Sequence, residues 1–328
     1  IPTRFGEQEG SEVGYNPHKP GRPSHHPLLC TIAGTRLCLY MSYRSGKAYS
    51  SAGWIDAIET VLSRLPKGMC PFLNRADIAF ACEEILSWHE VPDKIRPKYL
   101  FKLKKTKRVH EAISLVKEEE WSGESGFGVT QVADRVLKLR GWTQSRRVVL
   151  SRKLIEQQSP IESCTLFGVC QYEYGAYVTN LDNDYANAWQ IAMLYNQRCD
   201  SENIFDEMKN QWGLGGFCSK ELCVTEFAAR MTILSYNLWS IFVRFFNLSK
   251  HEEAKCSRKE FLQIASSLTR SGRETILKMS VTDKMWERLR DGYQRILFWI
   301  KSTATQLKLN VDNIVLPKIS LAQMAGST

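Results

Sequence analysis

The chain has 328 residues, of which 44 are Lys or Arg and 35 are Asp or Glu, so its formal net charge at pH 7 is +9. Hydrophobic residues make up 43% and charged residues 24%, a globular composition that excludes a disordered or collagen-like protein. The length allows about two domains, or one domain with an insertion. The basic excess favours a polyanionic partner, with nucleic acid ahead of a membrane surface.

The cysteines and the apolar stretches argue against a secreted or membrane-spanning chain. The ten cysteines are scattered and contain no Cys-x-x-Cys pair, so we expect reduced thiols in a cytoplasmic protein. The most apolar long stretch, Phe227–Phe246, is interrupted by Arg230, Asn237 and Arg244. Because polar and charged residues are costly inside a bilayer, we expect this stretch to be a buried helix.

The first hundred residues predict alternating strands and helices. Residues 15–27 contain four prolines and one glycine, which indicates an extended loop. After this loop, the apolar periodicity predicts strands at Leu28–Ala33, Leu37–Tyr43, Met69–Leu73 and Tyr99–Leu103, and helices at Ala52–Leu65 and Ala79–His89. Such alternation is typical of a layered α/β domain.

The pattern changes from Lys104 onward. Short apolar runs predict strands at Val148–Leu150, Thr165–Tyr172 and Ala176–Thr179, so residues 105–182 are expected to be rich in β-structure. A long helix is then predicted over Ala186–Trp212. The remainder, to about Leu309, is predicted to be helical.

Two basic runs frame the β-rich segment. Residues 94–108 contain eight Lys or Arg and no acid, and residues 135–153 contain seven more and no acid. We interpret them as a phosphate-binding surface, although a solvated charged face is the alternative. The residues selected from these runs as candidate DNA contacts are Lys104, Lys105, Lys107, Arg146 and Arg147. Trp142 could stack on an unpaired base, but a core position is the preferred interpretation.

Four polar residues share one face of the predicted long helix. At ~100° per residue, Tyr195, Arg198, Glu202 and Lys209 fall within a sector ~60° wide. A carboxylate beside two cations suits a metal ligand flanked by groups that hold phosphate oxygens. The Tyr195 ring could pack on a sugar, with its hydroxyl on a phosphate. The alternative is an exposed charged face with no binding role.

The spacing Tyr195-x2-Arg198-x3-Glu202-x6-Lys209 resembles the Tyr-Arg-Glu-Lys motif of bacterial insertion-sequence transposases of the DDE kind. Further segments resemble the branch of that family with a Gly-x-Gln-Glu-Gly segment. They are Gly6-Glu-Gln8-Glu9-Gly10, Gly14-Tyr15-Asn16-Pro17, Gly21-Arg22-Pro23-Ser24-His25-His26-Pro27-Leu28, Arg75-Ala76-Asp77 and Val178-Thr179-Asn180-Leu181. The ordered matches run from Phe5 to about Asn237.

The resemblance implies an α/β fold: an RNase H-like catalytic domain interrupted by a β-rich insertion, with a helical C-terminal part. The first half of the core would span 1–104, with its first strand missing, and the insertion 105–182. The second half of the core, with the helix of the catalytic Glu, would span 183–247, and the helical C-terminal region 248–328.

The resemblance also implies the chemistry. Asp77 and Glu202 would be the second and third acids that bind two Mg²⁺ ions, with Mn²⁺ as a substitute, for DNA strand cleavage and strand transfer. Tyr195, Arg198 and Lys209 would contact phosphates. The expected partner is double-stranded DNA, both transposon ends and target, bound by a homodimer in the nucleoid.

Two departures from the family pattern bear on activity. The family's first aspartate lies on a strand just upstream of the Gly-x-Gln-Glu-Gly segment, whereas this sequence has no Asp before Asp56. We therefore expect residues 1–328 alone to lack the first acid and to show no measurable cleavage. In addition, Ile78-Ala79-Phe80 follows Asp77, where relatives usually have a small polar residue and glycine.

Two other functions stay open at this point. One is a decayed transposase remnant that binds DNA without cutting it. The other is a metal-dependent nuclease of the same fold, which cuts DNA without joining it.

Overall fold

The structure is a computed structural model that describes residues 2–17, 19–123, 129–155, 171–247, 251–272 and 274–306. It is a mixed α/β protein that divides into two compact units. The first unit contains the residues up to 203 except 35–37, together with 218–226. The second contains 35–37, 204–217 and the described residues from 227 onward.

The first unit begins with a small antiparallel sheet of three strands in the order β1-β2-β3. These strands are β1 (Glu12–Val13), β2 (Pro23–Thr31) and β3 (Cys38–Ser45). Helix α1 (Trp54–Arg64) follows and packs against β2 and β3. The strands lie close to the positions predicted from the apolar runs, although β2 begins inside the proline-containing segment.

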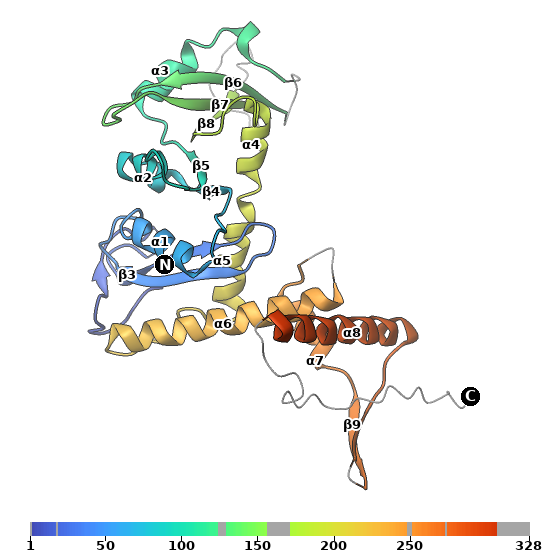
Figure 1. Ribbon diagram of the computed structural model, residues 1–328. Coiled ribbons are helices and arrows are strands. Elements are labelled where there is room, and N and C mark those ends of the chain that lie inside the picture. The colour runs from blue at the N-terminus through green and yellow to red at the C-terminus, as the bar shows by residue number, and fades with distance from the viewer. Residues whose placement is uncertain are drawn as a thin grey trace, which may run out of the picture. The chain divides into compact units, whose positions relative to one another are not determined.

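The first unit also contains a second sheet, which has five strands (Figure 1). Its order is β4-β5-β8-β7-β6, with β4 and β5 parallel and the other pairs antiparallel. The strands are β4 (Leu73–Ala76), β5 (Lys98–Lys102), β6 (Thr130–Leu137), β7 (Arg146–Ile155) and β8 (Gln171–Thr179).

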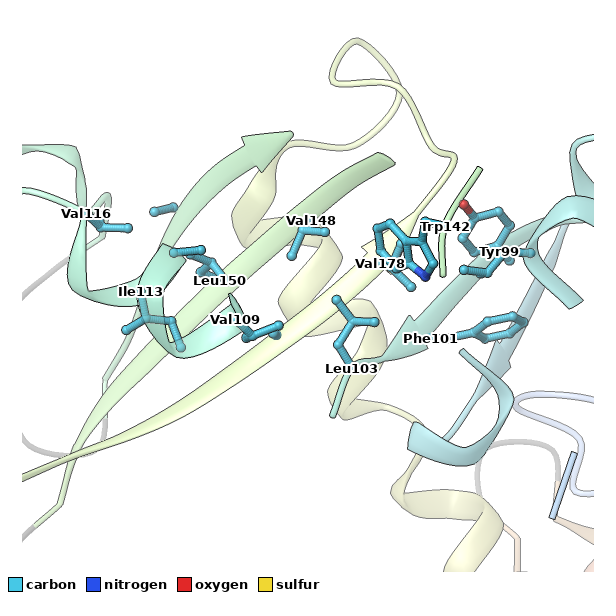
Figure 2. Close-up of a cluster of buried hydrophobic side chains, with 14 of the residues drawn as sticks. Tyr99, Phe101, Leu103, Val109, Ile113, Val116, Trp142, Val148, Leu150 and Val178 are labelled. Atoms are coloured by element: carbon cyan, nitrogen blue, oxygen red, sulfur yellow. The ribbon is translucent and has the colours of Figure 1, made fainter. Parts of the chain in front are cut away.

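Side chains alternate between the two faces of this sheet. On one face, Tyr99, Phe101, Val148 and Leu150 form a buried cluster with residues of α2 (Glu83–His89) and α3 (Lys107–Ser114) (Figure 2). On the other face, a second cluster is closed by α4 (Ala188–Asn196); it includes Leu100, Val149, Tyr177, Ile191 and Ala192. Apolar residues on both faces bury strand β5 between two layers of helices.

The segment 105–182 contains strands, as the apolar runs predict. Strands β6, β7 and β8 all fall within 105–182, and they extend the sheet that contains β4 and β5. Helix α3 and strand β6 are additional elements of this segment that the apolar runs do not predict. The expected strand Thr165–Tyr172 falls mostly outside the described residues; only its last two residues lie in β8.

The predicted long helix 186–212 is two helices. Helix α4 ends at Asn196, and α5 (Cys199–Gln211) begins three residues later. Between them the Arg198 amide donates to the Tyr195 carbonyl (2.9 Å), a spacing of three residues that tightens the turn and interrupts the α-helical pattern. A single helical wheel therefore does not describe this region.

The second unit is not all helical, which corrects the prediction for the C-terminal part. Its helices are α6 (Leu222–Phe246), which starts in the first unit, α7 (Ala254–Leu262) and α8 (Asp283–Gln306). Between α7 and α8, β9 (Ser266–Ser271) and β10 (Glu274–Met279) form an antiparallel hairpin. Gly272, with a φ of 61°, occupies a turn conformation that disfavours other residues.

Helix α6 was expected to be buried, and it is buried on one face only. On one face, Ala229, Ile233, Tyr236 and Val243 are buried. On the other face, Phe227, Met231, Leu234 and Leu238 are exposed. Among the described residues, no helix is both long and apolar enough to cross a membrane.

A buried ion-pair network fastens α2 to the sheet. Arg146, at the start of β7, has only 2% of its side chain exposed, and it donates to Glu83 (2.6 Å) and Glu90 (2.7 Å) at the two ends of α2. Glu90 also accepts a hydrogen bond from the Tyr99 hydroxyl (2.6 Å). The hydrogen bonds from Arg146 lower the pKa of Glu83 to about 2.

Replacing Arg146 should therefore destabilise the first unit. We expect Arg146→Met to lower the free energy of unfolding by about 3 kcal/mol, because two carboxylates lose their buried partner. Chemical denaturation followed by tryptophan fluorescence measures this change. Arg140→Met, which alters an exposed arginine before the same strand, is the matched control and should change stability by less than about 0.5 kcal/mol. Equal effects of both substitutions would contradict the role of the network.

The same network predicts how stability depends on pH. Glu83 has a folded-state pKa below its ordinary value of 4.5, so the folded state binds fewer protons and stability falls as the pH drops from about 4.5 to about 2. Burial lowers the pKa of His89 from 6.5 to about 4. Protonation of His89 therefore lowers stability further as the pH falls from 6.5 to about 4. In Arg146→Met the loss below pH ~4.5 should be smaller than in the parent. Denaturation curves at several pH values test this difference.

Candidate catalytic and metal-binding site

Asp77 lies at the end of a strand in the five-stranded sheet. It is the first residue after β4, and its Oδ1 accepts a hydrogen bond from the Ile78 amide (2.8 Å), which caps a short 3₁₀ turn at Ile78–Phe80. The carboxyl group is half exposed. The backbone therefore holds Asp77 through Oδ1, and its Oδ2 lies 3.8 Å from the Arg198 guanidinium.

Contacts on both sides of the sheet hold β4 in place. The Asn74 side chain is 3.1 Å from Nε2 of His89 in α2, and the Arg75 guanidinium donates to the carbonyl of Leu194 near the end of α4. Since a helix C-terminus carries partial negative charge, the Arg75–Leu194 contact is favourable. It brings the end of α4 to the end of β4.

Tyr195, in the last turn of α4, is buried. Its ring packs against Tyr177 of β8 with centroids 4.7 Å apart, and its hydroxyl points to Asp77 Oδ1 at 3.4 Å. Burial raises the pKa of this hydroxyl, so it stays protonated as a donor. The buried ring does not offer a face to a sugar, which corrects that expectation; the hydroxyl remains at the site.

Arg198 lies between the two predicted metal ligands. Its Nη2 is 2.8 Å from Glu202 Oε1 and 3.8 Å from Asp77 Oδ2. Since both distances start at the same nitrogen, the two carboxylate oxygens are at most 2.8 + 3.8 = 6.6 Å apart. Burial by itself lowers the pKa of the Arg198 guanidinium. The neighbouring groups Tyr195, Asp77 and Glu202 outweigh this effect, so the pKa is raised overall.

The oxygen ligands that these residues offer are of the kind that Mg²⁺ or Mn²⁺ prefers. Mg²⁺ is usually held by one or two carboxylates together with waters and substrate phosphates, and oxygen ligands disfavour zinc. The described residues contain no group of three His, Cys, Asp or Glu that could hold a metal ion on its own. Asp77 and Glu202 are the two carboxylates that lie close together at this place, at most 6.6 Å apart.

The predicted lysines lie on exposed surfaces. Lys104, Lys105 and Lys107 are exposed around the start of α3, next to the exposed Arg108, and none of the four has an ion-pair partner among the described residues. Lys209 is exposed in α5, seven residues after Glu202, and belongs to the second unit. Tyr195, Arg198 and Glu202 therefore lie beside Asp77 in the first unit. Lys209 is not part of this group.

Arg146 and Arg147 are not available to phosphates, which corrects the expectation for the second basic run. Arg146 is the centre of the buried network with Glu83 and Glu90, and Arg147 forms an ion pair with Asp134 (2.6 Å). These acids lie outside the acid-free run and meet it only in the fold. Trp142, as preferred, is buried in the core, with Arg146 over its ring.

Two positioning residues were not identified from the sequence. Glu9, in the Gly-x-Gln-Glu-Gly segment, accepts a hydrogen bond from the Leu222 amide (2.8 Å) and so caps the start of α6. Arg75 was noticed only as part of the Arg-Ala-Asp segment, and its contact with Leu194 requires the fold. Glu9 and Leu222 are 213 positions apart in the sequence, so no local pattern could indicate this cap.

The position of Arg198 predicts competition with metal ions. In DNA-free protein, a divalent cation must displace the guanidinium from Asp77 and Glu202. Because exposed ion pairs each contribute up to about 1 kcal/mol, Arg198→Ala should bind Mn²⁺ about three- to tenfold more tightly. Electron paramagnetic resonance of free Mn²⁺ measures this affinity. Arg140→Ala, which removes a distant exposed arginine, should leave it unchanged. Weaker Mn²⁺ binding by Arg198→Ala would show instead that Arg198 holds the carboxylates in place.

Comparison with known proteins gives the family. Residues 2–298 match the family model described as transposase DDE domain group 1. No curated protein matches the chain. Among solved structures, the cryo-EM structure of a piggyBac transposase synaptic complex with hairpin DNA is 12% identical, with a TM-score of 0.43. The alignment covers 76% of this chain and 46% of that chain, so this chain spans less than half the length of that transposase. Because the family model covers most of its residues, the chain belongs to the transposases with a DDE domain of group 1.

Proposed function

We propose that this chain is the catalytic part of a DNA transposase of an insertion sequence, with Asp77 and Glu202 as ligands of two Mg²⁺ or Mn²⁺ ions. One observation carries this proposal: the two acids, 202 − 77 = 125 residues apart in the sequence, meet at the Arg198 guanidinium. A carboxylate pair that depends on the fold of the whole first unit suits the chemistry of a DDE family member.

The proposed domain is RNase H-like, with residues 105–182 as its insertion. In support, Asp77 follows a strand paired in parallel with its neighbour, and Glu202 lies on a helix after the last strand of the sheet. Strands β6 to β8 lie between the two acids in the sequence, where the insertion is expected. On this proposal 1–104 and 183–247 are the two halves of the core, and 248–328 is the C-terminal region.

The side chains around the acids would each have a defined role. Asp77 and Glu202 would bind the ions, which would activate water or a DNA 3′-hydroxyl and stabilise the leaving oxygen of an in-line displacement. The Tyr195 hydroxyl would orient Asp77. Arg198, once displaced from the carboxylates, would hold a phosphate oxygen. Lys209, which lies in the second unit, is proposed as a separate phosphate contact. The family pattern places a third carboxylate on a strand upstream of Gly6.

The DNA surface is proposed at the start of α3. Lys104, Lys105, Lys107 and Arg108 place four exposed positive charges within five residues, at a helix N-terminus that itself favours anions. Such a cluster would contact the backbone of transposon ends or target DNA without reading bases. The action on DNA is proposed to take place in the nucleoid.

The proposal predicts that both acids are needed for metal binding. With a short DNA duplex present, we expect the parent chain to bind Mn²⁺, and Asp77→Asn and Glu202→Gln each to weaken that binding by at least about tenfold, because each change removes one charged ligand. Mn²⁺ paramagnetic resonance measures it directly. Asp206→Asn, four residues beyond Glu202 on α5, is the matched control and should bind Mn²⁺ like the parent.

The proposed reaction is tested by assays of DNA strand cleavage and strand transfer. The protein assayed is the full-length product of the reading frame that contains this chain. Metal-dependent cleavage and joining that are lost in Glu202→Gln support the transposase. Cleavage without joining would identify a nuclease, and DNA binding without cleavage would identify a remnant. Mn²⁺ binding that is unaffected by both acid substitutions would overturn the site.

The basic cluster predicts a salt dependence. Each phosphate neutralised on duplex DNA contributes about 0.9 to the slope of log affinity against log salt concentration. Substituting Lys104, Lys105 and Lys107 with Ala should therefore reduce the slope by about 2–3 units. Fluorescence anisotropy with a labelled duplex at several salt concentrations gives the slope.

The control is a triple substitution with the same change in net charge: Lys67, Lys259 and Lys284, all exposed, are changed to Ala. It should keep the parent slope. If both triple variants lose the same number of units, the lysines act through net charge alone and the cluster is not a DNA-contacting surface.

A further inference from the structure

Lys102 is the last residue of β5, the strand next to β4 in the five-stranded sheet. It belongs to the first basic run but was not among the lysines selected from it. Lys104 and Lys105 are exposed, whereas Lys102 is half-buried. A lysine that is withdrawn from water usually has a charged partner. The ion pairs at the site are those of Arg198, and in the described part of the chain none involves Lys102.

The register of the parallel strand pair places Lys102 beside Asp77. Ala76 of β4 is paired with Phe101 of β5, and the backbone of Asp77 continues in the extended conformation, with φ −83° and ψ 179°. The next pair in this register is therefore Asp77 with Lys102. Because neighbouring strands lie about 4.8 Å apart, the two side chains start from adjacent positions.

Both side chains leave the sheet on the face that α4 covers. Along β5, Phe101 belongs to the cluster with α2 and α3 (Figure 2), and Leu100 belongs to the cluster that α4 closes. Since successive side chains of a strand alternate between faces, Lys102 shares the face of Leu100. Asp77 is on the same face, because its Oδ1 is 3.4 Å from the hydroxyl of Tyr195 in α4. The register and the alternation together bring a lysine to the candidate metal site.

On its other side, Lys102 is the cross-strand partner of Tyr177 in β8. Residues paired in this way have Cβ atoms about 5 Å apart. The Tyr177 ring packs against that of Tyr195, with centroids 4.7 Å apart. Lysine side chains lay their methylene stem along apolar surface and keep the ammonium group toward water. The stem of Lys102 therefore has an aromatic neighbour on one side and Asp77 on the other.

Lys102 differs from Arg198 in being available to an anion. The Arg198 guanidinium is occupied by Glu202 and lies near Asp77, so it must be displaced before it binds a phosphate. Lys102 has no such carboxylate to leave. An ammonium group binds phosphate as a point charge and does not need the planar geometry of a guanidinium.

We propose that Lys102 binds a non-bridging oxygen of the DNA phosphate that reacts at Asp77 and Glu202. This inference rests on the proposed function and adds a residue to it. Lys102 holds the reacting phosphate beside the carboxylates, and the exposed lysines that follow it in the chain contact flanking phosphates. Its charge offsets that of the phosphate and fixes the phosphate in position. Lys102 forms no covalent bond and transfers no proton in this role.

The test measures how strongly DNA and Mn²⁺ promote each other's binding to residues 1–328. Ions shared between the carboxylates and a phosphate link the two affinities by one coupling factor, which is the same in both directions. Paramagnetic resonance of free Mn²⁺ gives this factor as the ratio of Mn²⁺ affinities with and without a short duplex, after subtraction of the Mn²⁺ that the duplex binds alone. Fluorescence anisotropy of a labelled duplex with and without Mn²⁺ gives it independently.

Lys102→Met keeps most of the stem and removes the charge, so it should lower the coupling factor about five- to tenfold. Without DNA it should bind Mn²⁺ at least as tightly as the parent, because a positive charge near the cations is gone. Lys102→Arg keeps the charge and should retain most of the factor. Lys98→Met is the matched control and should behave like the parent, since Lys98 is a half-buried lysine on the same strand and face, about 13 Å away.

A coupling factor in Lys102→Met that equals the parent's overturns the proposal, as does a parent that binds DNA and Mn²⁺ independently. Weaker Mn²⁺ binding by Lys102→Met without DNA also overturns it, because the lysine then supports the carboxylates or the fold. Asp77→Asn separates this result from failure of the proposed function. If Asp77→Asn binds Mn²⁺ like the parent, the carboxylate site itself is wrong. If Asp77→Asn loses Mn²⁺ while Lys102→Met keeps the full factor, only the role of Lys102 is refuted.

Discussion

The parallel pairing of β4 with β5 is the constraint on which the candidate site depends. Strand β4 has four residues and lies at the edge of its sheet, so its position is set by β5, which is buried on both faces. Asp77 follows β4 directly, and the contacts of Asn74 and Arg75 tie the strand to helices on opposite sides. The location of one carboxylate thus depends on the packing of the whole first unit.

Electrostatic balance explains why two acids can lie so close together. Carboxylates within a few ångströms of each other repel, and a cation between them offsets this repulsion. In this fold Arg198 provides that cation from the turn between α4 and α5, where the helix is interrupted. A continuous helix would carry Arg198 to a different angle relative to Glu202 and Tyr195. The break in the helix is therefore part of the site geometry.

The two basic runs look alike in the sequence and differ in the fold. Around α3 the lysines stay exposed, whereas Arg146, Arg147 and Arg152 each form an ion pair with an acid from another segment. Buried arginines need such partners because an unpaired charge in the interior is costly. The absence of acids within a run therefore says nothing about acids that the fold brings to it. In the first run the lysines around α3 remain exposed, whereas the arginines of the second run stabilise the sheet.

The sequence by itself determined the local elements and the family. Apolar periodicity located β3, α1 and β5 to within about two residues, because that periodicity is a local property of the chain. The Tyr-Arg-Glu-Lys spacing led to the family that the match to residues 2–298 shows. The tertiary structure alone decided which charges are neutralised, that Tyr195 is buried, and that one face of α6 stays open. These outcomes depend on contacts between residues far apart in the chain, for which a single sequence carries no periodic signal.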